Sequence, residues 1–117
     1  MTQQEIFDKV ARHLLTQKKR ATVSGHCRYR TPDGCKCAIG CLISDEDYDP
    51  EFEGERVTHL LGRHAIPSLE NLDCDRIFLS RLQVLHDTGL PINWPKALHD
   101  FAISFCLSPT ILSEFLP

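Results

Sequence analysis

Residues 26–41, HCRYRTPDGCKCAIGC, set this chain apart from an all-helical protein. Side-chain character alternates over residues 27–30, as it does in a β-strand. Thr31-Pro32-Asp33-Gly34 is a strong turn signal, because proline presets one backbone dihedral angle and glycine accepts a positive one. Residues 35–37 then supply a returning strand. The pattern predicts a small antiparallel β-hairpin.

Helical patterns dominate the rest of the chain. Thr2 and Glu5 have the spacing of a capping box, which predicts a helix that ends at the basic residues 18–20. A short apolar segment, residues 38–43, is compatible with either a buried helical turn or a strand, and residues 44–55 read as an acidic surface loop. Further helices are predicted over residues 56–64, 73–86, 94–105 and 109–115.

Two of these helices have a predicted inner face. Asp73 is expected to cap the helix over 73–86, and the inward residues are Ile77, Phe78, Leu82 and Leu85. In the helix over 94–105 they are Leu98, Phe101, Ala102 and Phe105. The expected fold class is therefore α+β: mostly helical, with about five helices around one core and a small antiparallel β-hairpin.

Composition and length favour one folded domain outside the membrane. An apolar fraction of 42% with 25% charged residues is ordinary for a globular protein, and 117 residues fit a single domain spanning 1–117. No apolar run approaches the roughly 20 residues of a membrane-spanning helix. The charged N-terminus lacks the apolar stretch of a signal peptide. We therefore expect a cytoplasmic protein whose six cysteines remain reduced.

The cysteines raise the question of a metal site. Cys27, Cys35, Cys37 and Cys41, together with His26, offer enough ligands for a tetrahedral zinc. Their spacing, C-x7-C-x-C-x3-C, lacks the C-x-x-C pairs that zinc knuckles usually present. The pattern permits zinc without requiring it, and no cofactor is expected.

A reactive thiol is the second interpretation. Cys37 is predicted where the hairpin enters a helix, and a helix N-terminus with Lys36 and Arg28 nearby lowers a thiol pKa. The adjacent pair His86-Asp87 offers a base, although such a pair at a helix end commonly serves as a cap.

The third interpretation is structural, because free cysteines pack as small hydrophobes. Cys27 and Cys37 are then expected to pack together near His86-Asp87, and Cys74 and Cys106 to lie among apolar residues of their helices. The exposed binding residues become Arg28, Tyr29, Arg30 and Lys36, the first three being of types enriched at binding hot spots.

Charge is divided unevenly along the chain. Residues 1–37 hold eight basic residues against three acidic ones, whereas residues 44–56 hold seven acidic residues against Arg56. This asymmetry favours steering of a charged partner, unless the two parts neutralise each other within the fold. A protein and a small anionic ligand such as a nucleotide are both open as partners. Nucleic acid is not expected, because residues 109–116 contain no Arg, Lys, Asn or Gln to read bases.

Two motifs carry a resemblance to a known family. Residues 27–43 fit C-x-Y-R-x-x-D-G-x-K-C-A-x-G-x-L-I, and residues 82–87 fit L-Q-x-x-H-D. Over nearly its whole length the chain resembles a family of small uncharacterised proteins encoded in tailed phages, prophages and some bacterial genomes. Cys35 and Cys41 look peculiar to this chain. The resemblance stresses Cys27, Tyr29, Arg30, Gly34, Lys36, Cys37, Gly40, His86, Asp87 and Trp94.

The family supplies no established activity. Its setting implies a non-enzymatic accessory protein that binds and modulates a host protein, including components of host defence. The alternatives from the residues themselves are a small Cys/His-site protein, with structural zinc or a reactive thiol at Cys27, Cys37, His86 and Asp87, and a protein that sequesters an anionic nucleotide.

Overall fold

The first helix begins where its capping box predicts. In the computed structural model, which describes residues 1–115, the Thr2 hydroxyl accepts the Glu5 N–H at 3.2 Å and the Glu5 carboxylate accepts the Thr2 N–H at 2.9 Å. Helix α1 (Gln3–Gln17) then buries one continuous face, made of Ile6, Phe7, Val10, Ala11, Leu14 and Leu15.

The described chain is mostly helical, and its predicted α+β class is confirmed. After α1 the α-helices are α2 (Val57–Arg63), α3 (Pro67–Glu70), α4 (Arg76–Thr88) and α5 (Trp94–Ser104). Strands β1 (Thr22–Val23) and β2 (His26–Cys27) form one antiparallel pair. Short 3-10 helices complete the chain: η1 (Gly40–Leu42), η2 (Pro50–Phe52), η3 (Pro91–Asn93) and η4 (Thr110–Phe115). Within residues 1–115 no helix has the length and apolarity to cross a membrane.

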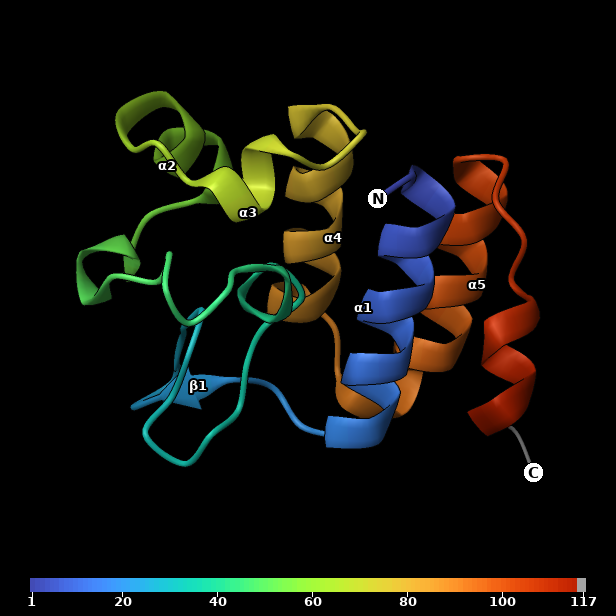
Figure 1. Ribbon diagram of the computed structural model, residues 1–117. Helices are drawn as coiled ribbons and strands as arrows, with labels where there is room; N and C mark the ends of the chain where they lie inside the picture. The colour runs from blue at the N-terminus through green and yellow to red at the C-terminus, as the bar shows by residue number, and fades with distance from the viewer. Residues whose placement is uncertain (116–117) are drawn as a thin grey trace.

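Helices α1, α4 and α5 pack around an aromatic cluster. The ring centroid of Phe101 lies 6.0 Å from that of Phe7, 5.2 Å from Phe78 and 4.6 Å from Phe105. α2 and α3 lie on the side of α4 away from α5, and the β-hairpin lies below them near the end of α4 (Figure 1). The predicted inner face of α5 is confirmed, with Leu98, Phe101 and Ala102 buried and Phe105 half-buried.

The hairpin is displaced from its predicted position. Thr22 pairs with Cys27 and Val23 with His26, around a Ser24-Gly25 turn in which both residues have positive φ. The predicted pairing across residues 31–34 survives only as an isolated bridge between residues 30 and 36. Backbone bonds from the Thr31 N–H to the Cys35 carbonyl and from the Cys37 N–H to the Tyr29 carbonyl flank this bridge. The ladder goes no further, because the Tyr29 N–H donates to the Glu53 carboxylate at 2.8 Å instead of to the Cys37 carbonyl, and the outward-pointing N–H of residue 30 donates to the same carboxylate at 3.1 Å.

Three local predictions on the helices are wrong. Helix α4 is capped by Asp75, whose carboxylate accepts the Phe78 N–H at 2.9 Å, and not by Asp73. Ile77 was expected in the core but is 60% exposed, because α4 is rotated so that Phe78 and its neighbour Leu79 point inward. Cys106 is exposed rather than buried, since α5 ends two residues earlier.

Candidate functional site

A small polar pocket forms where four separate segments meet at the hairpin. Its volume is about 230 Å³, and its floor and walls come from the hairpin, the segment after it, the loop that precedes α2, and the last turns of α4. The lining residues are His26, Cys27, Arg28, Tyr29, Cys37, Gly54, Glu55, Arg56, Gln83 and Asp87. Cys27, Cys37 and Asp87 all line this pocket.

His86 lies directly behind this pocket and is completely buried. Its Nε2 atom accepts the backbone N–H of Ala21 at 3.0 Å, so Nε2 carries no proton. The proton is therefore on Nδ1, which donates to the Asp87 carboxylate at 2.6 Å. The imidazole also stacks on the Trp94 ring with centroids 5.7 Å apart. His86 lies in the last turn of α4, as expected, but it faces inward and links α4 to the segment that leads into β1.

Cys27 points its thiol at the end of the same helix. The thiol donates to the backbone carbonyl of Asp87 at 3.9 Å, and the side chain is half-buried. Burial raises the pKa of the Cys27 thiol above its ordinary value, and the nearby Asp87 charge raises it further. The environment therefore holds Cys27 in its neutral, weakly nucleophilic form.

Cys27, His86 and Asp87 include a set of potential metal-ligand atoms, one from each, that lie within 4.8 Å of one another. The observed hydrogen bonds do not fit a zinc ion there. Both nitrogens of His86 are engaged, one by the Ala21 N–H and one by Asp87. The 2.6 Å separation between His86 and Asp87 is that of a hydrogen bond, and a ligand role would require breaking one of these bonds. The arrangement is that of a structural network.

Cys37 is not placed as a nucleophile. It is 2% exposed, and burial raises the pKa of its thiol far above the ordinary value. The Gly40 N–H donates to its sulfur at 3.2 Å, which opposes the rise and does not overcome it. The expectation of a low-pKa thiol is therefore wrong, because desolvation outweighs the local turn. Cys41, one turn later, has its pKa raised to about 12, also chiefly by burial.

Tyr29 was expected to face outward but is only 3% exposed. Its hydroxyl donates to the Glu55 carbonyl at 2.5 Å and accepts from the Gln83 amide at 3.0 Å. Its own carbonyl approaches Gly40 so closely that a Cβ atom at position 40 would lie 1.9 Å from the oxygen. Tyr29 therefore supports the pocket from within.

Arg30 is also turned into the protein. Its guanidinium lies 4.6 Å from the centre of the Tyr48 ring, donates to the Ile43 carbonyl at 2.8 Å and pairs with Asp45 at 2.7 Å. Within residues 1–115 this ion pair is the one that joins the basic N-terminal part to the acidic stretch 44–56. The charge asymmetry of the chain thus remains largely uncompensated by direct ion pairs.

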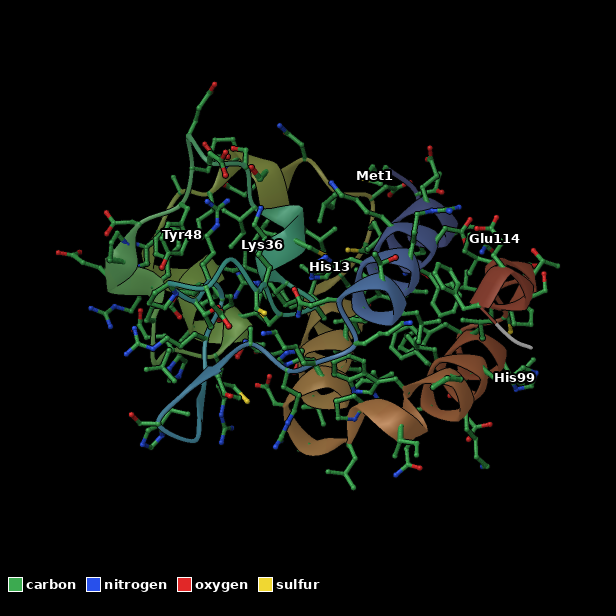
Figure 2. All side chains as sticks on the ribbon, turned by 90° about the horizontal axis from the view of Figure 1, so that it is seen from below. Met1, His13, Lys36, Tyr48, His99 and Glu114 are labelled. Carbon is green, nitrogen blue, oxygen red and sulfur yellow. The ribbon has the colours of Figure 1, made fainter. Side chains whose placement is uncertain are left out.

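Lys36 lies away from the pocket, against α1. The Gln17 amide accepts the Lys36 N–H at 2.8 Å and donates to the Lys36 carbonyl at 3.0 Å, and His13 Nε2 donates to the same carbonyl at 2.8 Å. Figure 2 shows His13 and Lys36 next to each other at this junction. Of the four predicted binding residues, only Arg28 is both exposed and part of the pocket wall.

Arg56 is a pocket residue that sequence reasoning missed. It is exposed, lines the pocket and immediately precedes α2. The one available signal was that it is the single basic residue at the end of the acidic stretch. No protein-family model, curated protein or solved structure matches this chain.

Proposed function

We propose that this protein is a non-enzymatic accessory protein of the phage type, which binds and modulates a host protein in the bacterial cytoplasm. Its resemblance to phage-encoded proteins supplies the setting. The internal engagement of His86, Cys37 and Tyr29 supports a non-enzymatic role, because these groups are bonded or buried rather than presented to a substrate.

The observation that carries the proposal is an apolar groove between α4 and α5, with a volume of about 430 Å³. Val84, on its rim, is 53% exposed, and Ile77, two turns earlier on the same face of α4, is 60% exposed. Such exposure of large aliphatic side chains beside a groove is typical of an interaction surface. The lining residues of this α4–α5 groove are Arg81, Val84, Leu85, Ala97, Asp100, Phe101, Ser104 and Phe105.

Shape and charge together favour one kind of occupant. A groove between two neighbouring helices accepts the apolar face of a third helix. Of the two charged residues in the lining, Asp100 already pairs with Lys96 at 3.2 Å, whereas Arg81 has no carboxylate within ion-pair distance in the described chain. The proposed occupant is therefore an amphipathic helix of the host protein with an acidic residue opposite Arg81.

The test compares matched surface variants in capture from host lysate. Val84→Glu places a charge in the groove, whereas Ile103→Glu places the same charge on α5, at a residue that is 59% exposed and outside the groove lining. The wild-type protein and Ile103→Glu should capture the same host protein, and Val84→Glu should lose it. The captured protein is then purified, and binding is measured by calorimetry with Arg81→Glu as a further variant.

The expected affinity loss is at least about tenfold for each groove variant, or roughly 1.4 kcal/mol. Equal capture by Val84→Glu and wild type would contradict the proposal, as would a solution dimer of this chain that is disrupted by Val84→Glu. The free energies of unfolding of Val84→Glu and Arg81→Glu should lie within about 0.5 kcal/mol of the wild-type value, because the substituted residues are on the surface.

A further inference from the structure

Independently of the groove, we propose that the polar pocket binds a small ligand that carries an oxyanion, either a phosphate or a carboxylate, next to a hydroxyl or amine donor. The oxyanion is held between Arg28 and Arg56, and the donor faces Asp87.

The charged side chains of the pocket wall differ in whether the protein itself pairs them. The Glu55 carboxylate is engaged by Arg63 and lies 3.7 Å from the His64 ring nitrogen. Arg28 and Arg56, by contrast, make neither an ion pair nor a side-chain hydrogen bond to the part of the chain that the structure describes. Two arginines from separate segments therefore line one concavity, and neither guanidinium has a partner in the part of the chain that the structure describes.

Two arginines without partners in one pocket favour an anionic ligand. A guanidinium presents a planar fork of N–H donors that matches the oxygens of phosphate or carboxylate in a bidentate manner. Arg28 directly follows β2 and Arg56 immediately precedes α2, so the two lining arginines come from separate segments of the chain. An oxyanion between them gains charge-assisted hydrogen bonds from both.

The negative charge of Asp87 restricts the class of ligand that this pocket accepts. Its Oδ1 atom accepts the proton on His86 Nδ1, while its Oδ2 atom has no hydrogen-bond partner among residues 1–115. A bare oxyanion is repelled by this carboxylate. A ligand with a hydroxyl or amine beside its oxyanion satisfies the free oxygen and reduces that repulsion.

Pocket size sets the limit on the ligand. Pockets for drug-sized ligands have volumes of roughly 300–1,000 Å³, and this one is smaller, at about 230 Å³. The proposed ligand is therefore smaller than a complete nucleotide, of which only the sugar-phosphate end would enter the pocket. This revises the nucleotide interpretation: the groups recognised are a phosphate and a neighbouring hydroxyl, and the base stays outside.

The experiment is calorimetric titration of the full chain with four probes: inorganic phosphate, glycerol phosphate, glycerate and AMP. Glycerol phosphate and glycerate distinguish the phosphate from the carboxylate version of the ligand. Arg28→Gln and Arg56→Gln should each lower the affinity for the tighter-binding of these two probes by about tenfold or more, equivalent to roughly 1.4 kcal/mol. Arg76→Gln is the matched control, because Arg76 is exposed, is outside the pocket and makes no ion pair in the described chain.

Asp87→Asn tests whether the pocket selects its ligand or merely attracts anions through its positive charge. The measured quantity is the preference between inorganic phosphate and glycerol phosphate. Loss of the negative charge should strengthen binding of inorganic phosphate relative to glycerol phosphate. The proposal is overturned if neither glycerol phosphate nor glycerate binds, if Arg76→Gln weakens binding as much as Arg28→Gln, or if Asp87→Asn leaves the preference between the probes unchanged. Equal folding stability of the arginine variants and wild type is checked by urea unfolding.

Discussion

His86 holds the last turn of α4 to the residue before β1, because its Nε2 atom accepts the Ala21 N–H at 3.0 Å. Both residues are completely buried, so this hydrogen bond is made away from water. The polar pocket lies just in front of this link, and Asp87, its partner on Nδ1, forms part of the pocket wall. Removal of His86 should therefore affect both the fold and the pocket.

Replacement of His86 by alanine should lower the free energy of unfolding by about 3 kcal/mol. The change leaves a cavity beside Trp94 and leaves the buried Ala21 N–H without an acceptor. Urea unfolding measures the loss, and His99→Ala is the control because His99 lies exposed on α5. A loss below about 1 kcal/mol would show that the network contributes little.

Tyr29→Phe should destabilise the protein by about 1–2 kcal/mol, since it leaves the Gln83 amide and the Glu55 carbonyl without their shared partner. Tyr48→Phe is the comparison. It also loses one hydrogen bond, from the hydroxyl to Glu53 at 2.6 Å, but it keeps the ring against Arg30 and is only half-buried. The loss in Tyr29→Phe should be the larger; the reverse order would contradict the buried position of Tyr29.

Helix α1, Tyr29 and the inner face of α4 show where the sequence was sufficient to predict the structure and where it was not. Helix α1 was predictable because its capping box and apolar spacing are local. The burial of Tyr29 was not, because its partners lie 24 to 54 residues later in the chain: Glu53 accepts its N–H, and Glu55 and Gln83 bond to its hydroxyl. The inner face of α4 was ambiguous: Ile77 and Phe78 are adjacent and equally apolar, and only packing against α5 selects Phe78.

Zinc should be substoichiometric in the purified protein when measured by elemental analysis. The reason is that Cys27 is held in its neutral form and both nitrogens of His86 are engaged in hydrogen bonds. Addition of EDTA should leave the urea midpoint unchanged. The view that Cys27, His86 and Asp87 form a structural network would be contradicted if the wild-type protein contained one equivalent of zinc and Cys27→Ser contained none.

Alkylation of the native protein should distinguish three cysteines by their exposure. Cys106 is exposed and should react first, and half-buried Cys27 should react more slowly. Cys37, which is buried and has a raised thiol pKa, should react only when the protein unfolds. Peptide mass spectrometry after timed treatment with iodoacetamide gives the order. Early labelling of Cys37 would revive the reactive-thiol interpretation.

Stability should fall as the pH drops below neutrality, in part because of His13. Burial lowers the pKa of His13 below its ordinary value of 6.5, so the unfolded chain binds a proton more readily than the folded one. The stabilisation is complete above pH 6.5 and is lost as the pH falls through 6.5 toward the lower folded pKa. His13→Gln does not titrate and retains an N–H donor for the Lys36 carbonyl. The free energy of unfolding, measured against pH, should fall more steeply on acidification for the wild type than for His13→Gln. Parallel curves for the two proteins would exclude a contribution from His13.

The close approach of Gly40 to the Tyr29 carbonyl has an evolutionary consequence. Any side chain at position 40 would overlap backbone, and no repacking of neighbouring side chains relieves that overlap. Selection should therefore keep glycine at this position wherever the hairpin and η1 are retained. Cys35 lies in the core and Cys41 packs against it, but neither meets such a backbone overlap, so other small apolar residues can replace them. Among relatives that descend from a common ancestor, the glycine rather than the cysteines should be the lasting mark of this fold.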